Sequence, residues 1–299
     1  MMLLLLMGKK DELIAKDPKN KEIIKPILRG RDIKRYKAEF ADLWIIMTHN
    51  GIKDKKSGLN IPRIDIKDYP LIKEHLDHYW EKLEKRCDQG DTPYNLRNCA
   101  YIKEFEKEKI VYQELTQGSR FAYDKKGEYF ISNTAYLLTG KDIKFLIAFL
   151  NSKLIEYAFN SFICISIGKK GIRWLNQYMQ ELFIPELSKK QQKPFIALVD
   201  YILYAKEKGL EKEAKLFEQV IDNLIYDYYF EEEMKQAECY ITDKVTSLIE
   251  PFNDNDSDES KEKYIKLLYK TINNDKDIYK GLIQSKNVKE VKIILDKLK

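Results

Sequence analysis

The stretch EKIVYQELTQGSRFAYDKKGEYFISNTAYLL, residues 108–138, decides the fold class of this chain. Apolar and polar residues alternate from Ile110 and again from Phe121, and a period of two is typical of half-buried β-strands. Gly118 and the DKKG sequence at 124–127 are turn signals between and after these runs. We therefore predict paired strands in this part of the chain.

Helical and extended segments flank these strands on both sides. KDIKFLIAFLNSKLIEYAFNSF at 141–162 is strongly apolar and predicts a buried helix, and RWLNQYMQELFIPEL at 173–187 predicts a short one. Upstream, DLWIIMT at 42–48 is typical of a buried strand, and YPLIKEHLDHYWEKLEKR at 69–86 has apolar residues at helical spacing. The first 187 residues are therefore predicted to mix helix and strand, with a small sheet and packed helices.

Beyond this region the apolar pattern becomes helical throughout. Apolar residues recur every three or four positions through 193–241 and again over 261–299. Between them, NDNDSDES at 253–260 has the composition of an acidic linker. We predict an α+β chain with a mixed region over 1–187, a helical spacer or docking region over 188–252, the linker, and a C-terminal helical segment.

Positive charge is concentrated in the first two thirds of the chain. Residues 1–190 hold 35 Lys and Arg against 26 Asp and Glu, whereas residues 191–299 hold 18 against 22. Clustered cations attract polyanions because they release the counterions condensed on phosphates. The pattern favours a nucleic-acid partner for the first part, although lysines that merely solubilise a surface give the same counts.

The cysteines and the first residues indicate the compartment. Cys87, Cys99, Cys164 and Cys239 form no CxxC pair, which favours reduced thiols in a cytoplasmic protein. The opening MMLLLLM is too short for a spanning helix and lacks the flanks of a signal peptide. We expect a cytoplasmic chain without a membrane partner.

Motifs for catalysis or cofactor binding are scarce. The sequence has no GxGxxG, P-loop, GxSxG, NPPY or DPPY, so it predicts no nucleotide cradle and no catalytic residue. His75 and His78 have the spacing of two ligands on one helix, but no Cys or carboxylate cluster accompanies them, so no metal site is predicted. Asp-x-Lys triplets such as Asp65 to Lys67 leave one alternative open, a magnesium-dependent restriction endonuclease.

Several segments occur in the order found in a known family. They are KDELIAKDPKNKEIIKPILRGRDIKRY, YPLIKEHLDHYWEKLEKR, PYNLRNCAYIKEFEKEKIVYQELTQGSRFAYDKKGEYFISNTAYLLTG, FLIAFLNSKLIEYAF and GKKGIRWLNQYMQELFIPEL. Together, over about residues 9–187, they resemble the TaqI-like C-terminal specificity domain. That domain is the target-recognition part of type II restriction-modification enzymes with a DNA-adenine methyltransferase core.

The resemblance implies a module that recognises a double-stranded DNA sequence and performs no chemistry itself. A methyltransferase or endonuclease polypeptide, or a missing N-terminal part, is the implied catalytic partner. S-adenosylmethionine and magnesium are expected only in that partner, and this chain is expected to hold no cofactor. The helices after residue 187 either pack as a core or dock that partner. A further alternative is a non-functional remnant of a disrupted restriction-modification gene.

ISIGKKGIRW at 165–174 is the segment that we expect to contact DNA most directly. Its two glycines permit a close backbone approach to a phosphate. Lys169 and Lys170 are point charges for phosphates, and Arg173 carries the planar fork that reads guanine O6 and N7. The alternative is a solvated connection in which Arg173 covers Trp174.

Three further segments supply the other predicted DNA contacts. The stretch after the first predicted strand offers Gln113, Gln117, Ser119, Arg120, Lys125 and Lys126. LRGRDIKRYK offers Arg29, Arg31, Lys34 and Arg35, and IKDKKSGLNIPR offers Lys53, Lys55, Lys56 and Arg63. Each segment has a plainer alternative, which is an exposed hairpin for the first, pairing with carboxylates for the second and a solvated turn for the third.

Overall fold

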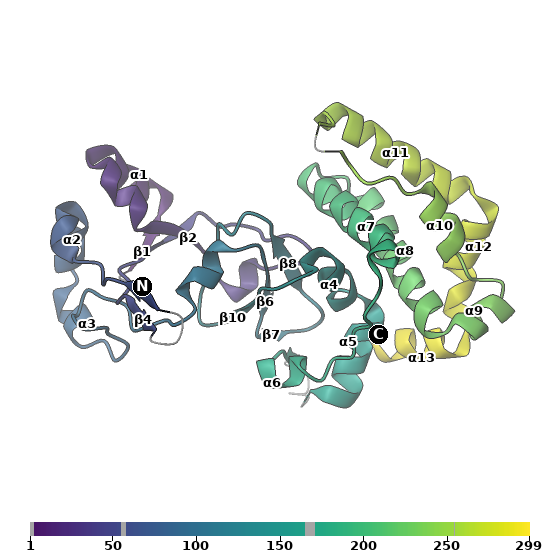
Figure 1. The fold of residues 1–299 in the computed structure, drawn as a ribbon, viewed down its shortest axis with the longest axis horizontal. Helices are drawn as coiled ribbons and strands as arrows, with labels where there is room; N and C mark the ends of the chain where they lie inside the picture. Colours follow the sequence, from purple (N-terminus) through teal and green to yellow (C-terminus); the bar gives the residue numbers. More distant parts are fainter. Residues whose placement is uncertain (1–2, 55–57, 165–170, 254) are drawn as a thin grey trace. The chain divides into compact units, whose positions relative to one another are not determined.

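The computed structural model describes residues 3–54, 58–164, 171–253 and 255–299 (Figure 1). By its contacts the chain divides into two compact units. Unit 1 consists of the segments 1–32, 39–109 and 124–139. Unit 2 consists of the segments 33–38, 110–123 and 140–299. The chain therefore passes repeatedly from one unit to the other. The predicted division at residue 187 stays a prediction.

A four-stranded sheet in the order β1-β3-β2-β9 organises unit 1. β3 (Leu43–Ile46) pairs antiparallel with both β1 (Leu4–Leu6) and β2 (Ile24–Leu28). β2 also pairs in parallel with β9 (Phe130–Ile131). The buried strand predicted at 42–48 is therefore confirmed, and it lies inside the sheet.

Three helices accompany this sheet: α1 (Met7–Lys16), α2 (Pro70–Asp77) and α3 (Trp80–Glu84). Ile72, Leu76 and Leu83 come from the predicted apolar stripe and are fully buried in one core with residues of β2 and β3. The single helix predicted over 69–86 is in fact two helices, because the backbone leaves helical angles at Tyr79, with φ of −114° and ψ of 18°.

The remaining elements of unit 1 are short. They are β4 (Ile52–Asp54), β5 (Leu59–Ile61), β10 (Ala135–Leu138) and the 3-10 turns Pro18–Glu22, Gly30–Asp32, Ile66–Asp68 and Ile102–Glu106. β4 and β5 form an antiparallel hairpin. This hairpin carries part of the predicted DNA-contacting segment.

The paired strands predicted over residues 108–138 are confirmed only in part. β6 (Lys109–Gln113) and β8 (Phe121–Asp124) are neighbours in a small sheet, which confirms that part of the prediction. β9 pairs with β2 instead of continuing a hairpin with β8. The carboxylate of Asp124, the last residue of β8, accepts hydrogen bonds from the backbone N–H groups of Glu128 and Tyr129, at 3.1 and 2.9 Å. Those groups are therefore bonded to a side chain and not to the backbone of β8.

Unit 2 is mainly helical beyond its strands. Its α-helices are α4 (Ile143–Leu150), α5 (Lys153–Ala158), α6 (Asn176–Met179), α7 (Lys189–Glu207), α8 (Glu211–Tyr229), α9 (Glu231–Gln236), α10 (Thr242–Leu248), α11 (Asp258–Asn274), α12 (Lys276–Gln284) and α13 (Lys289–Lys297). A turn of π-helix, Phe159–Ile163, follows α5. The long helices α7 and α8 lie side by side (Figure 1). The α+β class is confirmed.

The acidic run at 253–260 ends inside a helix. Ser257 caps α11, which begins at Asp258 with Glu259 in its first turn. Negative side chains stabilise a helix N-terminus because the helix dipole is positive there. The last residues predicted as linker therefore start a helix.

Candidate nucleic-acid interface

A two-stranded ribbon in unit 2 presents Arg173. β7 (Leu115–Thr116) pairs antiparallel with β11 (Ile172–Arg173), so that Arg173 lies opposite Leu115. Gly171 precedes this pair with φ of +109°, and a Cβ on it would lie 2.4 Å from the carbonyl oxygen of Thr116. Only glycine fits both the backbone angle and this close approach. The ribbon therefore depends on one of the two glycines that the sequence singled out.

Arg173 is exposed and already oriented by a carboxylate. Its Nε lies 2.8 Å from Oε1 of Glu114, and 53% of its side chain is exposed. An exposed ion pair of this kind contributes about 0–1 kcal/mol. A guanidinium held so weakly is free to exchange the carboxylate for a base edge or a phosphate at little cost.

Trp174 faces the interior next to Arg173. Its ring stacks on Phe159 at 3.8 Å and meets Phe121 edge-on at 4.9 Å, and the residue is 1% exposed. Its backbone N–H also donates to the carbonyl oxygen of Glu114, which joins the end of β11 to the residue before β7. Because the indole is enclosed by these rings while the guanidinium is solvated, the two side chains do not share one surface.

Four predicted contacts, one at the end of β6 and three in the turn between β7 and β8, lie in different environments. Gln117 is exposed and Arg120 is half-buried. Ser119 is 2% exposed, and its backbone N–H donates to Oε2 of Glu156 at 3.0 Å. Oε1 of Gln113 is sealed from solvent and has no partner in the described part of the chain. Of these four side chains, Gln117 and Arg120 are the ones placed to reach a ligand without rearrangement.

A buried ion pair fixes the start of the turn that follows β8. Nζ of Lys109 lies 2.5 Å from both Oδ2 of Asp124 and the carbonyl oxygen of Phe105, and the two charged side chains are 0% and 4% exposed. Burial lowers the pKa of Lys109, and the bond to Asp124 opposes this shift. Lys125 and Lys126 follow this pair directly in the turn and are exposed.

The LRGRDIKRYK segment contains two arginines that are paired with carboxylates. In unit 1, Arg29 donates from Nε and Nη2 to both oxygens of Asp32, at 2.9 and 2.8 Å. Burial acts to raise the pKa of Asp32, but the bonds from Arg29 keep it below its ordinary value. In unit 2, Nε of Arg35 lies 3.1 Å from Glu218. Arg31 is exposed and Lys34 is half-buried.

The predicted segment at 52–63 is described only in part. Nη1 of Arg63 lies 3.4 Å from Asp91, with 41% of the arginine side chain exposed. Lys55 and Lys56 lie outside the described residues, and so do Lys169 and Lys170 of the glycine-flanked loop. Their roles as DNA contacts, like those of the other predicted residues, stay predictions.

The residues considered for metal chemistry have other partners. Asp65 accepts a hydrogen bond from the backbone N–H of Lys67 at 3.0 Å and so caps a 3-10 turn. His75 contacts the ring of Tyr79, at a centroid distance of 5.5 Å. Within the described ranges, no three or more His, Cys, Asp or Glu side chains gather where they could hold a metal ion.

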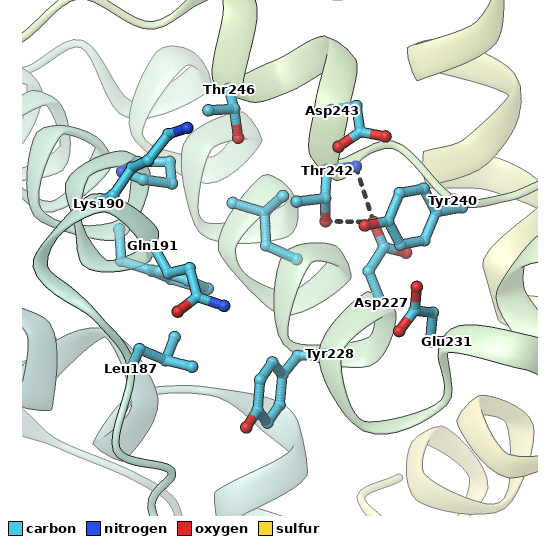
Figure 2. A pocket seen from close by; sticks show the side chains of 13 residues that line it. Leu187, Lys190, Gln191, Asp227, Tyr228, Glu231, Tyr240, Thr242, Asp243 and Thr246 are labelled. Carbon is cyan, nitrogen blue, oxygen red and sulfur yellow. Dashed lines mark hydrogen bonds between the residues drawn. The ribbon is translucent and has the colours of Figure 1, made fainter.

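A cavity of about 590 Å³ lies among the helices of unit 2, between the start of α7, the end of α8 and α10 (Figure 2). Oδ2 of Asp227 accepts hydrogen bonds from the backbone N–H groups of Ile241 and Thr242, at 2.9 Å, and from Oγ1 of Thr242, at 2.8 Å. Burial nevertheless raises the pKa of Asp227 to about 6. Since this carboxylate fixes the start of α10, its first role is structural.

Sequence reasoning did not find the carboxylates that position the predicted contacts. Glu114 holds Arg173, Glu156 holds the turn at Ser119, and Asp124 holds the turn at Lys125. Each is a single acidic residue in a charge-rich chain, and its partner lies far away in the sequence or on the backbone. Only the burial of Asp124 inside an alternating strand pattern gave a signal, since a charged residue there needs a partner.

Comparison with known families decides the relationship. The profile of the TaqI-like C-terminal specificity domain matches residues 25–184, which is more than half of the chain. The chain belongs to this family. The matched residues thus include β3, β9 and nearly all of β2 in the sheet of unit 1, the β7–β11 ribbon and both turns described above. The resemblance predicted from the sequence is confirmed.

A solved structure shares the fold of this specificity-domain chain. The type IIL restriction-modification enzyme MmeI, in complex with DNA, matches with a TM-score of 0.54 and 13% sequence identity. The match covers 90% of this chain and 34% of that chain, so this chain spans about a third of the enzyme's length. No curated protein matches the sequence. None of the described helices is long and apolar enough to span a bilayer.

Proposed function

We propose that this chain recognises a short sequence in double-stranded DNA as the specificity module of a restriction-modification enzyme. Membership of the specificity-domain family supports recognition of DNA, and the fold shared with a DNA-bound restriction-modification enzyme supports the same setting. Methylation and cleavage are assigned to another polypeptide or to another part of a longer one, and S-adenosylmethionine and magnesium are assigned to that catalytic part.

The observation that carries this proposal is the placement of Arg173. A base-reading arginine needs an exposed guanidinium on a rigid support, with its orientation already restricted. Arg173 has half of its side chain exposed, a paired strand beneath it and Glu114 at 2.8 Å. Gln117 and Arg120 extend the same part of unit 2 with an amide and a second guanidinium, which suit adenine and guanine edges.

Selection of bound duplexes from a random pool tests the proposal directly. The wild-type chain should enrich one short site, and its affinity for that site should fall steeply as salt rises, because phosphate contacts release counterions. Arg173→Ala should lose discrimination at one base pair, by about 1–3 kcal/mol. Arg97→Ala, which removes an exposed guanidinium outside the predicted set, is the matched control. Equal binding of all duplexes by the wild-type chain would refute the proposal.

A further inference from the structure

A second cavity, of about 470 Å³, lies within unit 1 and has an aromatic wall. Phe40, Trp44 and Tyr129 line it. The ring of Phe40 is 5.5 Å from each of the other two, at interplanar angles of 84° to Trp44 and 49° to Tyr129. The cavity has the size of small-molecule sites in proteins, which hold about 300–1,000 Å³. Three differently oriented rings suit a planar ligand better than a flexible chain, because a flat group stacks on one ring and meets the others by their edges.

Three lysines line the cavity together with these rings. Nζ of Lys10 lies 4.3 Å from the centre of the Trp44 ring and 2.8 Å from Asp11. Lys21, which is exposed, and Lys25, which is half-buried, also line the cavity. Glu106 and Glu128 are the acidic residues of the lining. The cavity therefore offers cations for an anionic group and two carboxylates that can accept hydrogen bonds from amino groups.

One polar group in the wall has no protein partner. Nε1 of Trp44 is sealed from solvent and makes no hydrogen bond to any described residue. An indole N–H is a donor only, and leaving such a buried donor unpaired costs about 1–3 kcal/mol. Because this atom has no exposed surface, a ligand in the cavity reaches it only if the wall moves, so the site as it stands offers the Trp44 ring and not its N–H.

The aromatic wall is fixed by the same turn that exposes two of the predicted DNA contacts. Asp124 accepts the backbone N–H of Tyr129, and a Cβ on Gly127 would lie 2.3 Å from the carbonyl oxygen of Glu106. This packing sets Tyr129 in the cavity lining while Lys125 and Lys126 stay exposed on the turn.

We propose that this cavity binds a nucleotide, with the base against the aromatic rings and the phosphate near the lysines. Rings and cations in one site are what binders of unpaired nucleic acid use, because every base has a π-face and every nucleotide a negative charge. A purely apolar ligand would not use the charge of the lysines, and inorganic phosphate would leave the rings unused. The inference goes beyond the proposed function, because duplex reading by Arg173 does not need this site.

The nucleotide has two sources, a free nucleotide or an unpaired nucleotide of a DNA strand, and the experiment separates them. Calorimetric titration of the full chain uses deoxyadenosine monophosphate and inorganic phosphate as one pair of probes. Single-stranded oligonucleotides with bases, and matched abasic ones, are the second pair. Binding of the monophosphate identifies a free-nucleotide site, and binding of only the base-containing strand identifies a strand site. Equal binding of abasic and base-containing strands, with no binding of the monophosphate, overturns the proposal.

Two substitutions tie the binding to the cavity. Tyr129→Leu removes a stacking ring and should weaken binding of the nucleotide probe about tenfold, and Lys25→Gln should weaken it several-fold and lower its salt dependence. Tyr79→Leu and Lys82→Gln change exposed residues of unit 1 outside the cavity and should leave the affinity unchanged. Thermal unfolding shows whether Tyr129→Leu folds, and Lys25→Gln decides alone if it does not.

Unchanged affinity in Lys25→Gln and in a folded Tyr129→Leu would also overturn the proposal. The outcome is separable from that of the proposed function, which is read from duplex discrimination by Arg173→Ala on the same protein. Equal binding of all duplexes by the wild-type chain, or unchanged discrimination in Arg173→Ala, with nucleotide binding intact, would refute only the proposed function. Duplex discrimination that Arg173→Ala loses, without nucleotide binding at the cavity, would refute only this inference.

Discussion

At the scale of single residues, the buried pair of Lys109 and Asp124 should be the most sensitive to substitution. Asp124 accepts three bonds around the turn that carries Lys125, and neither side chain of the pair reaches solvent to any extent. Lys109→Met leaves the carboxylate buried without its cation, which typically costs about 3–5 kcal/mol. We expect a loss of this size in the free energy of unfolding measured in urea.

The double substitution Lys109→Met with Asp124→Asn is the control for this prediction. It removes both charges, so its stability should lie above that of Lys109→Met alone. If the single and double variants were equally stable, the charge left on Asp124 would not be the cause of the loss.

Asp227 predicts a pH dependence of stability. Burial raises its folded-state pKa to about 6, above its ordinary value, so between about pH 4 and 6 the folded chain binds more protons at this site than the unfolded one. Stability from this residue is therefore full below about pH 4 and is lost as pH rises through 6. The difference between the folded-state and unfolded-state pKa values corresponds to roughly 3 kcal/mol.

Urea unfolding between pH 4.5 and 7.5 measures this effect. The difference in unfolding free energy between wild type and Asp227→Asn should change across that range, with the wild type losing relative stability toward pH 7.5. A constant difference would contradict the raised pKa of Asp227.

What the sequence could predict at this scale depended on how local each interaction is. The exposure of Arg173 followed from its place next to a glycine-flanked basic loop, and the structure shows it exposed. Its pairing with Glu114 was not predictable, because 59 residues separate the two and many other carboxylates were available. The same holds for Arg35 and Glu218, which lie 183 residues apart.

At the scale of elements, the β7–β11 ribbon should depend on Gly171. Gly171→Ala forces a Cβ to within 2.4 Å of the Thr116 carbonyl oxygen, at a positive φ that alanine rarely adopts. Gly209→Ala is the matched control, since Gly209 also has positive φ, +72°, but has nothing within 4 Å of its Cβ position. We expect Gly171→Ala to lose more stability and also to lose duplex discrimination, measured by unfolding and by fluorescence anisotropy. Equal effects of the two substitutions would show that the ribbon tolerates displacement.

The turn after β8 should contribute affinity without sequence preference. Replacing Lys125 and Lys126 by alanine should weaken binding to all duplexes alike. It should also lower the slope of log affinity against log salt by about one for each phosphate that is no longer neutralised. Binding measured at several salt concentrations tests this. A change in the preferred sequence, or an unchanged slope, would contradict the phosphate role of these lysines.

Elements were predictable where one local rule decided them. The strands at β3, β6 and β8 and the helices α7 and α8 followed from apolar spacing. The break between α2 and α3 did not, because the apolar spacing of Ile72, Leu76 and Leu83 runs through it as it would in one helix. The pairing of β9 with β2 did not, because it depends on a tertiary partner. The parallel pairing joins residues about a hundred positions apart, and no local period records such a distance.

At the scale of the whole molecule, the class and the family were predictable, but the division into units was not. The chain enters each unit three times, through segments as short as 33–38 and 124–139. Composition and charge change near residue 190, where the sequence suggested a boundary, whereas contacts follow the strands. Charge therefore described which part carries the cations, and not which parts fold together.

The measurement that tests the central claim most directly is a base-pair substitution scan of the selected duplex, carried out with wild type, Arg173→Ala and Arg97→Ala. We predict that wild type and Arg97→Ala lose affinity, by about 1–3 kcal/mol, when one particular G·C pair is changed, and that Arg173→Ala is indifferent at that pair alone. If Arg173→Ala weakens binding equally at every position, or not at all, Arg173 does not read a base.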